Sequence, residues 1–247
     1  MMKLALVLFS FSFMAFTPEL EKLDPSDFEL LSAVNHSSWD MILQKHVSTS
    51  GKVDYESLKT NPNLSRYLSI LKAANPDDAS WSENDKKAFW INAYNAFTVR
   101  LILDNYPVKS INDISKPWDK KFIVINGKNY SLNQIENDIL RPKFKDARVH
   151  FAINCASISC PKLHNKAFTK DNLESKLETL TKAFVNNSSM NELSADAVKV
   201  SKIFDWYGVD FKTDGTLIDW LNKYSNTSIN SDAKVSYKSY NWNLNKK

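Results

Sequence analysis

Glycine is scarce in this chain, with four residues in a total of 247: Gly51, Gly127, Gly208 and Gly215. A phosphate-binding P-loop and a dinucleotide-binding fingerprint both need several glycines within one short window. No two of the four glycines share such a window. The sequence therefore excludes the common nucleotide-binding loops.

A strong excess of charge is also missing. Lys and Arg number 32 against 28 Asp and Glu, which gives a formal net charge of +4. The basic residues do not gather in a concentrated patch, which a nucleic-acid-binding module needs. We therefore expect no nucleic-acid partner. The expected partner is an unidentified small molecule or peptide.

The chain has no apolar run long enough to span a membrane. Residues 4–16 follow Lys3 as an uninterrupted stretch of apolar residues and serines. Thirteen residues rise about 20 Å as a helix, whereas the hydrocarbon core is about 30 Å thick. A short basic start before such a run is typical of a secretory signal peptide. We predict a signal peptide over residues 1–17, periplasmic or extracellular export, and no stable membrane insertion after its removal.

The rest of the chain has the composition of a folded domain. Hydrophobic residues make up 43% and aromatic residues 12%, which is typical of a protein with a substantial core. Residues 18–38 are polar, contain two prolines and are expected to form a loose N-terminal arm. Residues 39–247 are expected to form a single globular domain.

The strongest periodic element covers residues 85–105. Phe89, Trp90, Tyr94, Phe97 and Leu101 place apolar side chains over most of its circumference. A proline at position 107 follows and stops the helix. An apolar surface this broad must be covered on several sides, so the sequence predicts a central helix.

Shorter elements surround this helix in the sequence. Further helices are expected over 39–47, 58–74 with an interruption near Asn61-Pro62, 131–141, 169–184 and 214–224. Strands are expected over 122–125 and 128–130, joined by an Asn-Gly turn, and over 149–153, 197–203 and 234–237. Because helices and strands do not alternate regularly, we expect an α+β fold. It would be a helix-rich single domain whose central helix packs on a small, mainly antiparallel sheet.

Both cysteines lie in one segment, Arg148-Val-His-Phe-Ala-Ile-Asn-Cys155-Ala-Ser-Ile-Ser-Cys160-Pro161. Other distinctive segments are Phe89-Trp-Ile-Asn-Ala-Tyr-Asn95, Leu132-Asn-Gln-Ile-Glu136, Ile139-Leu-Arg141, Lys202-Ile-Phe-Asp-Trp-Tyr-Gly208 and Tyr240-Asn-Trp-Asn-Leu-Asn245. Together they resemble the domain of unknown function 547 family over about residues 39–245. The resemblance implies an exported protein and, in broad terms, thiol chemistry. Relatives usually carry His after the Ile-Glu pair, where this chain has Asn137, so any activity that depends on that His is in question here.

The spacing of the cysteines leaves several kinds of chemistry open. A helix would place Cα atoms five residues apart at about 7.5 Å and a strand at about 17 Å, both beyond the ~7 Å limit for a disulfide. A Cys155–Cys160 disulfide therefore needs a compact turn and would stabilise the fold by about 2 kcal/mol. Alternatively, Pro161 favours a helix start that makes Cys160 its N-cap, where the dipole favours a thiolate. Zinc is not expected, because a second pair of ligands is missing.

A cysteine nucleophile needs a base, and His150 is the nearest histidine in sequence. On a strand, however, His150 and Cys155 would point to opposite faces and lie some 16 Å apart. A Cys155–His150 dyad thus requires a bend near Asn154. A core histidine hydrogen-bonded to its neighbours is the alternative interpretation.

Other polar residues are weaker candidates. Asn92 and Asn95 share a face of the central helix and are candidates for ligand binding, although a satisfied core amide is the simpler interpretation. Glu136 is a candidate for orienting the base, and Arg141 for anchoring a ligand, with an ion pair as the alternative for both. Trp206, Tyr207 and Trp242 are expected in the core.

Three functions follow from these residues. The first is a cysteine-dependent hydrolase or acyl transferase, with Cys155 as nucleophile, His150 as base and Glu136 orienting it. Asn92, Asn95, Arg141 and Cys160 would contribute to binding, and no metal or cofactor is expected. The second is a non-catalytic binding domain that a disulfide stabilises. The third is a thiol–disulfide exchanger, although its pair is C-x4-C rather than C-x-x-C.

Overall fold

Helix α4, Glu83–Asn105, is the longest element of the computed structural model, which describes residues 33–247. Its first turn is closed by a capping box. The Ser82 hydroxyl accepts the Asp85 backbone N–H at 3.1 Å, and the Asp85 carboxylate accepts the Ser82 N–H at 3.1 Å. Most of its residues are buried, as the apolar pattern predicts. The helix ends before Pro107, as expected.

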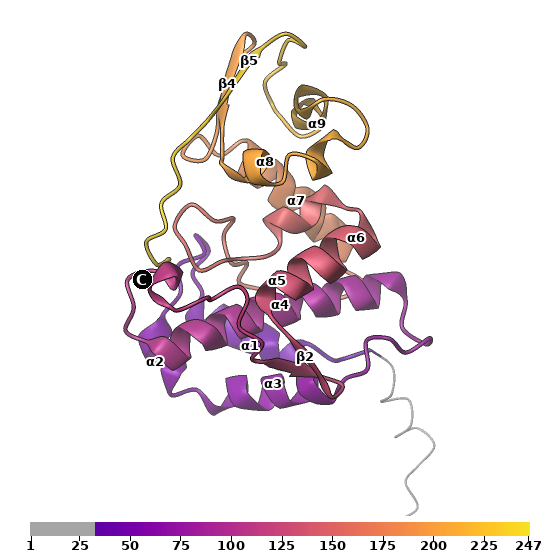
Figure 1. The fold of residues 1–247 in the computed structure, drawn as a ribbon, viewed down its shortest axis with the longest axis vertical. Coiled ribbons are helices and arrows are strands. Elements are labelled where there is room, and N and C mark those ends of the chain that lie inside the picture. The colour runs from indigo at the N-terminus through magenta and orange to yellow at the C-terminus, as the bar shows by residue number, and fades with distance from the viewer. Residues whose placement is uncertain (1–32) are drawn as a thin grey trace, which may run out of the picture. The chain divides into compact units, whose positions relative to one another are not determined.

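Three N-terminal helices pack beside α4. They are α1 (Ser37–His46), α2 (Tyr55–Lys59) and α3 (Pro62–Ala73), and α3 contacts both α1 and α4. Figure 1 shows α1 and α3 along the same side of α4. The predicted interruption near Asn61-Pro62 is confirmed, since the proline begins α3 and the Asn61 side chain caps it.

A two-stranded hairpin packs on the central helix. Strands β1 (Ile123–Ile125) and β2 (Lys128–Tyr130) pair antiparallel, with Ile125 opposite Lys128. The turn residues Asn126 and Gly127 have φ values of 48° and 71°, the left-handed conformation that this two-residue turn requires. Tyr130 meets Trp90 of α4 edge-on, with ring centroids 5.4 Å apart. The predicted hairpin is confirmed.

The helix that follows the hairpin contains a widened turn. It runs through α5 (Leu132–Gln134), a π-helical turn (Ile135–Leu140) and α6 (Arg141–Phe144). The Arg141 N–H bonds to the Glu136 carbonyl, five residues back. The expected end of this helix at residue 141 was wrong, because the helix continues past Pro142 to Phe144. The π-helical turn, which holds one more residue than an ordinary turn, directly precedes the proline and accommodates it.

The expected buried strand over residues 149–153 is also wrong. Residues Ala147–Phe151 form a 3-10 helix, and the Asp146 carboxylate caps it by accepting the Arg148 N–H at 3.0 Å. A short apolar run has no periodicity that separates a strand from a buried helical turn. Here the cap decides the conformation. His150 therefore lies on a helical turn rather than in a sheet.

The remaining elements follow the cysteine segment. Helix α7 (Leu173–Val185) packs on this 3-10 helix, and α8 (Ile203–Trp206) and α9 (Leu217–Asn222) follow. Strands β3 (Glu192–Leu193) and β4 (Ala197–Val200) pair antiparallel, while β4 and β5 (Lys234–Tyr237) pair parallel. The two strands expected from alternation are thus found, the first of them ending at Val200.

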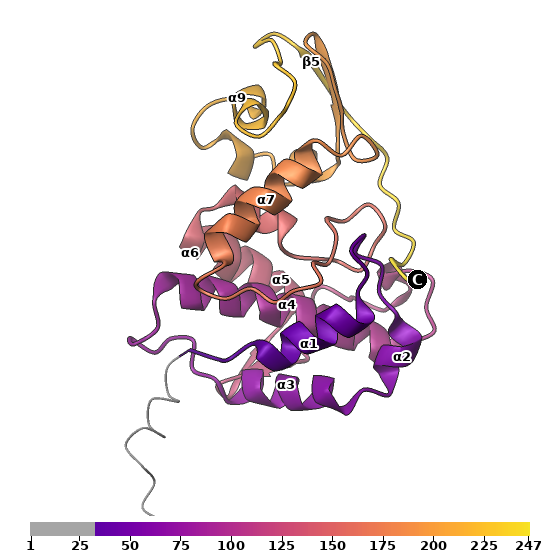
Figure 2. The ribbon, with the colours of Figure 1, turned by 180° about the vertical axis from the view of Figure 1, so that it is seen from behind.

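The end of the chain returns to the N-terminal helices. After β5 it runs back across the domain and finishes near α2, as Figures 1 and 2 both show. Leu244 bridges to Ser157, and Lys246 bridges to Val53. This return places Tyr240 and Trp242 next to the cysteine segment.

The fold class is as expected: an α+β single domain with small sheets and a central apolar helix. Residues 33–247 form one compact unit. The predicted signal peptide, residues 1–17, and residues 18–32 of the expected arm lie outside the described residues. Within the described residues, no helix is both long and apolar enough to cross a membrane.

Candidate functional site

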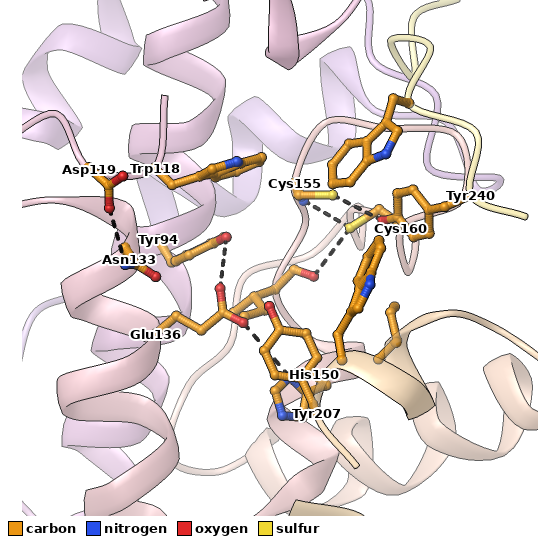
Figure 3. A pocket seen from close by; sticks show the side chains of 14 residues that line it. Tyr94, Trp118, Asp119, Asn133, Glu136, His150, Cys155, Cys160, Tyr207 and Tyr240 are labelled. Atoms are coloured by element: carbon orange, nitrogen blue, oxygen red, sulfur yellow. Dashed lines mark hydrogen bonds and ion pairs between the residues drawn. The ribbon is translucent and has the colours of Figure 1, made fainter. Parts of the chain in front are cut away.

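A cavity of about 270 Å³ lies between the π-helical turn, the cysteine segment and the returning C-terminal segment. Cys155, His150 and Glu136, the three residues expected to be catalytic, all line it, as does Cys160. Figure 3 shows the cysteines on one wall and Glu136 with His150 across from them. The fold thus brings Glu136 of the π-helical turn to the same cavity as His150 and the two cysteines of the later segment.

A tight turn presents Cys155 to this cavity. Ala156 has a φ of 59°, a left-handed conformation that is uncommon for a residue with a Cβ. The Asn154 side chain supports the turn by accepting the Ala156 N–H at 2.9 Å and donating to the Pro161 carbonyl at 2.8 Å. A Cys155–His150 dyad would require a bend near Asn154, and the structure contains this bend.

The Cys155 thiol has hydroxyl neighbours. Its Sγ lies 3.1 Å from the Ser157 hydroxyl and 3.2 Å from the Tyr240 hydroxyl. Burial opposes ionisation, but hydrogen bonds from Cys160, Ser157 and Tyr240 outweigh it and lower the pKa of Cys155 below its usual value. The same thiol is only partly buried. An accessible thiol that ionises more readily than an ordinary thiol is suited to nucleophilic attack.

Cys160 has the opposite character. It is buried, and burial together with the neighbouring Cys155 raises its pKa well above the usual thiol value. Its Sγ accepts the Cys155 backbone N–H at 2.9 Å. Both cysteines are free thiols in the described structure. A Cys155–Cys160 disulfide stays a prediction.

His150 is held by a carboxylate that the sequence analysis missed. Its Nε2 lies 2.8 Å from Asp210 Oδ2, and its Nδ1 lies 3.9 Å from Glu136 Oε1. An ionised carboxylate only accepts hydrogen bonds, so Nε2 carries the hydrogen and Nδ1 faces Glu136. Among the contacts of residues 33–247, no hydrogen bond joins His150 to Cys155. The predicted dyad shares a cavity but is not in contact.

Asp210 is itself anchored from the other side. Arg141 donates to it through Nε at 2.6 Å and Nη2 at 3.0 Å, a bidentate pair. Partial burial raises the pKa of Asp210, but hydrogen bonds from His150 and Arg141 prevail and hold it well below the usual range. Arg141, expected to anchor a ligand, instead fixes the carboxylate that orients His150. The sequence pointed to Asp210 in one way alone: it lies two residues after Gly208, the last residue of the distinctive segment that begins at Lys202.

Glu136 lies on the π-helical turn and is 7% exposed. Its Oε2 accepts the Tyr94 hydroxyl at 3.2 Å. Burial and the nearby Glu136 raise the pKa values of Tyr94 and Tyr207, which keeps both hydroxyls protonated as donors. Widened helical turns are frequent at functional sites, and this one aims Glu136 at the cavity.

The two candidate asparagines of α4, Asn92 and Asn95, hold neighbouring backbone in place and do not line the cavity. Asn92 exchanges two hydrogen bonds with the backbone of Phe168, at 2.7 and 3.0 Å. Asn95 donates to the Ala152 carbonyl at 2.9 Å and accepts the Asn154 N–H at 2.8 Å. Both side chains are therefore buried amides whose oxygen and nitrogen are hydrogen-bonded, which is the simpler of the two interpretations that the sequence allowed. Asn95 thereby fixes the residue before Cys155.

Several aromatic residues expected in the core line the cavity instead. Trp206 is 45% exposed, and its ring stacks on Trp242 with centroids 5.7 Å apart. Tyr207 stacks on His150 with centroids 4.1 Å apart. Tyr240 contacts both tryptophans and also Cys155. The expectation that Trp206, Tyr207 and Trp242 lie in the core was wrong, because an aromatic side chain suits a core and a cavity wall equally well.

Comparison with known families agrees with the cysteine segment and its neighbours. Residues 79–185 match the family described as Protein of unknown function, DUF547. The expected resemblance is thereby confirmed over that range. The DUF547 segment contains Glu136, His150 and Cys155, whereas Asp210 and Tyr240 lie beyond it. The chain has no match among curated proteins or among solved structures.

Asn137, the residue after Glu136, has a structural contact here. Its Oδ1 accepts from Arg141 Nη1 at 2.6 Å. It therefore helps to hold the guanidinium that anchors Asp210. Asn137 does not line the cavity.

Proposed function

We propose that this cavity is the active site of a cysteine-dependent hydrolase or acyl transferase. The observation that carries the proposal is the pairing of an accessible thiol of lowered pKa, Cys155, with a carboxylate-oriented imidazole, His150, across one cavity. Nucleophile, base and orienting group form the usual arrangement of covalent acyl transfer. The orienting group is Asp210 rather than Glu136.

The first half of the reaction uses the thiolate form of Cys155, in which the thiol proton has moved to His150 Nδ1. Cys155 Sγ attacks the acyl carbon, a C–S bond forms, and the carbonyl electron pair moves to oxygen. Tyr240 keeps its hydroxyl hydrogen, because burial and the two cysteines raise its pKa, and it lies beside the sulfur as a donor for that oxyanion. The bond to the leaving group then breaks, and the leaving group takes a proton from the His150–Glu136 pair.

The second half regenerates the thiolate. Water or an acyl acceptor gives a proton to His150 Nδ1 and attacks the thioester carbon, the C–S bond breaks, and the thiolate departs. Asp210 holds Nε2–H throughout, so that Nδ1 remains the basic nitrogen. Glu136 lies 3.9 Å from Nδ1 and can receive the proton in turn.

The test is to trap the acyl-enzyme with p-nitrophenyl acetate. We expect one acetyl group per chain on Cys155, identified by peptide mass spectrometry, followed by continuing release of p-nitrophenolate. Cys155→Ser should lose both signals. Cys160→Ser is the matched control and should keep them. Acetylation that persists in Cys155→Ser, or that falls mainly on Cys160 or lysines, would contradict the proposal.

The same acylation should follow the ionisation of Cys155. Because its pKa is lowered, thiolate is present above a midpoint that lies below the ordinary thiol pKa of about 8.5, and acylation stops as the pH falls through that midpoint. Tyr240→Phe removes one of the hydrogen bonds that lower the pKa, so its midpoint should move up. Tyr237→Phe, in β5, should leave the midpoint unchanged.

A thiol–disulfide exchanger is the second candidate, and one observation favours it. Cys155 and Cys160 are neighbours with pKa values shifted in opposite directions, which suits an attacking thiol and a resolving thiol. An exchanger would cycle reversibly with glutathione and would need both cysteines. Cys160→Ser separates the two functions: a hydrolase should still release p-nitrophenolate continuously, whereas an exchanger should lose its cycling with glutathione.

We also propose that residues 1–17 export the chain. The support is the short apolar run after a basic start. Fractionation of cells expressing the full chain should find it outside the cytoplasm with its first residues removed. Full-length protein retained in the cytosol would contradict this.

A further inference from the structure

The cavity has a charge opposite in sign to that of the chain. The whole chain carries a formal net charge of +4. The cavity is lined by two carboxylates, those of Asp119 and Glu136, and among the described residues that line it there is no Lys or Arg. Its interior therefore disfavours anionic ligands and favours cationic ones.

Glu136 is the more informative of the two carboxylates, because it is buried. Among residues 33–247, its one ion-pair partner within 4 Å is His150, at 3.9 Å. The same imidazole lies closer to Asp210, at 2.8 Å, and Asp210 also has Arg141. Buried carboxylates are normally paired with a cation. Glu136 therefore faces the cavity with its charge incompletely balanced.

Aromatic rings form the opposite wall of the cavity. Tyr240 lies 4.8 Å from Trp206 and 4.5 Å from Trp242, between ring centroids, and Trp118 lies 6.2 Å from Trp242. Figure 3 shows Tyr240 beside the cysteines, across from Glu136 and Tyr94. The face of an indole or phenol ring attracts a cation, most strongly where water is excluded.

We propose that the ligand recognised by this cavity carries an organic ammonium group. This inference rests on the proposed function, since the ammonium would belong to the acyl donor or acceptor that reacts at Cys155. The ammonium lies between the aromatic wall and Glu136, and Asp119 adds a second carboxylate near the cavity edge. An ammonium on an apolar stem satisfies both kinds of lining, whereas an anion satisfies neither.

Binding of three probes of similar size tests the inference: butylammonium, 1-butanol and butyrate. Tryptophan fluorescence reports occupancy, because Trp118, Trp206 and Trp242 line the cavity. We expect butylammonium to bind with a Kd at least ten-fold below that of 1-butanol, and butyrate to bind more weakly still. Added salt should raise the Kd of butylammonium and leave the Kd of 1-butanol unchanged.

Variants assign the preference to residues. Glu136→Gln should remove most of the preference for butylammonium, and Asp119→Asn, at an exposed position, should reduce it by a smaller factor. Asp205→Asn, on α8 and paired with Lys202, is the matched control and should change nothing. Equal or tighter binding of butyrate or of a neutral monosaccharide would overturn the inference. If Glu136→Gln does not fold, an unchanged preference for butylammonium in Asp119→Asn would also overturn the inference.

The Cys155→Ser variant separates this inference from the proposed function. It removes the nucleophile and keeps both carboxylates and all the rings, so it should still bind butylammonium more tightly than 1-butanol and butyrate. If butylammonium binds selectively and no acyl-enzyme forms, the proposed function fails and ammonium recognition stands as a binding property. If acylation occurs without any preference for the cation, this inference alone fails.

Discussion

Replacing Asp210 with asparagine will slow steady-state hydrolysis of p-nitrophenyl acetate by about 10²–10⁴-fold, the range over which general acid–base catalysis contributes. The reason is the tautomer of His150. The Asp210 carboxylate accepts Nε2–H and leaves Nδ1 basic. An asparagine amide can donate to Nε2, which moves the hydrogen to Nδ1 and removes the base.

The effect should fall on one step. p-Nitrophenolate is a good leaving group that needs no proton, so the first acetylation of Cys155 should remain fast. In the proposed mechanism the attack of water on the thioester needs His150, so the acyl-enzyme should accumulate. Stopped-flow measurement of the burst and of the steady state therefore separates a positioning role from simple unfolding.

Controls make the expectation specific to the His150 contact. Asp205→Asn, five residues earlier and exposed, should leave both phases unchanged. Asp210→Glu should restore part of the steady-state rate, because it keeps a carboxylate. If the burst and the steady state fall equally in Asp210→Asn, the residue only supports the fold.

Asp210 also contributes to stability in a pH-dependent way. Its pKa is lowered in the folded chain, so the stabilisation is present above the unfolded carboxyl pKa of about 3.9 and is lost as the pH falls below it. Asp210→Asn should lack this contribution at neutral pH. Denaturant unfolding at neutral and acid pH, compared with the unmodified chain, measures it.

The sequence predicted those elements whose signals are local. The Asn-Gly turn at Asn126-Gly127 specifies a conformation through its own backbone, and the structure contains it. The apolar circumference of residues 85–105 likewise requires burial on all sides. These features need no information about distant residues.

The site was predictable only in part, for a physical reason. Cys155, His150 and Glu136 were chosen as candidates because their residue types are chemically distinctive, and the structure places all three at one cavity. Their partners come from distant segments: Asp210 is 60 residues from His150, and Tyr240 is 85 residues from Cys155. Such contacts depend on tertiary packing, which neither periodicity nor spacing reveals.

The aromatic cluster beneath the site should carry the largest single contribution to stability. Phe151, the residue after His150, is 1% exposed. Its ring lies 4.9 Å from Phe184 and 5.8 Å from Trp220, between centroids, and 6.0 Å from Phe211, the residue after Asp210. The cluster therefore joins the 3-10 helix that carries His150 to the turn that carries Asp210.

We expect Phe151→Ala to lower the free energy of unfolding by about 3–5 kcal/mol, the usual cost of truncating a buried phenylalanine. Urea denaturation at neutral pH measures it. Val209→Ala is the matched control, because Val209 lies beside the same turn but is 79% exposed, and it should change stability by no more than about 0.5 kcal/mol. A loss below about 1 kcal/mol for Phe151→Ala would mean that the cluster repacks around the gap. In that case the distance between His150 and Asp210 would not depend on the cluster, and the steady-state rate of the variant would be unchanged.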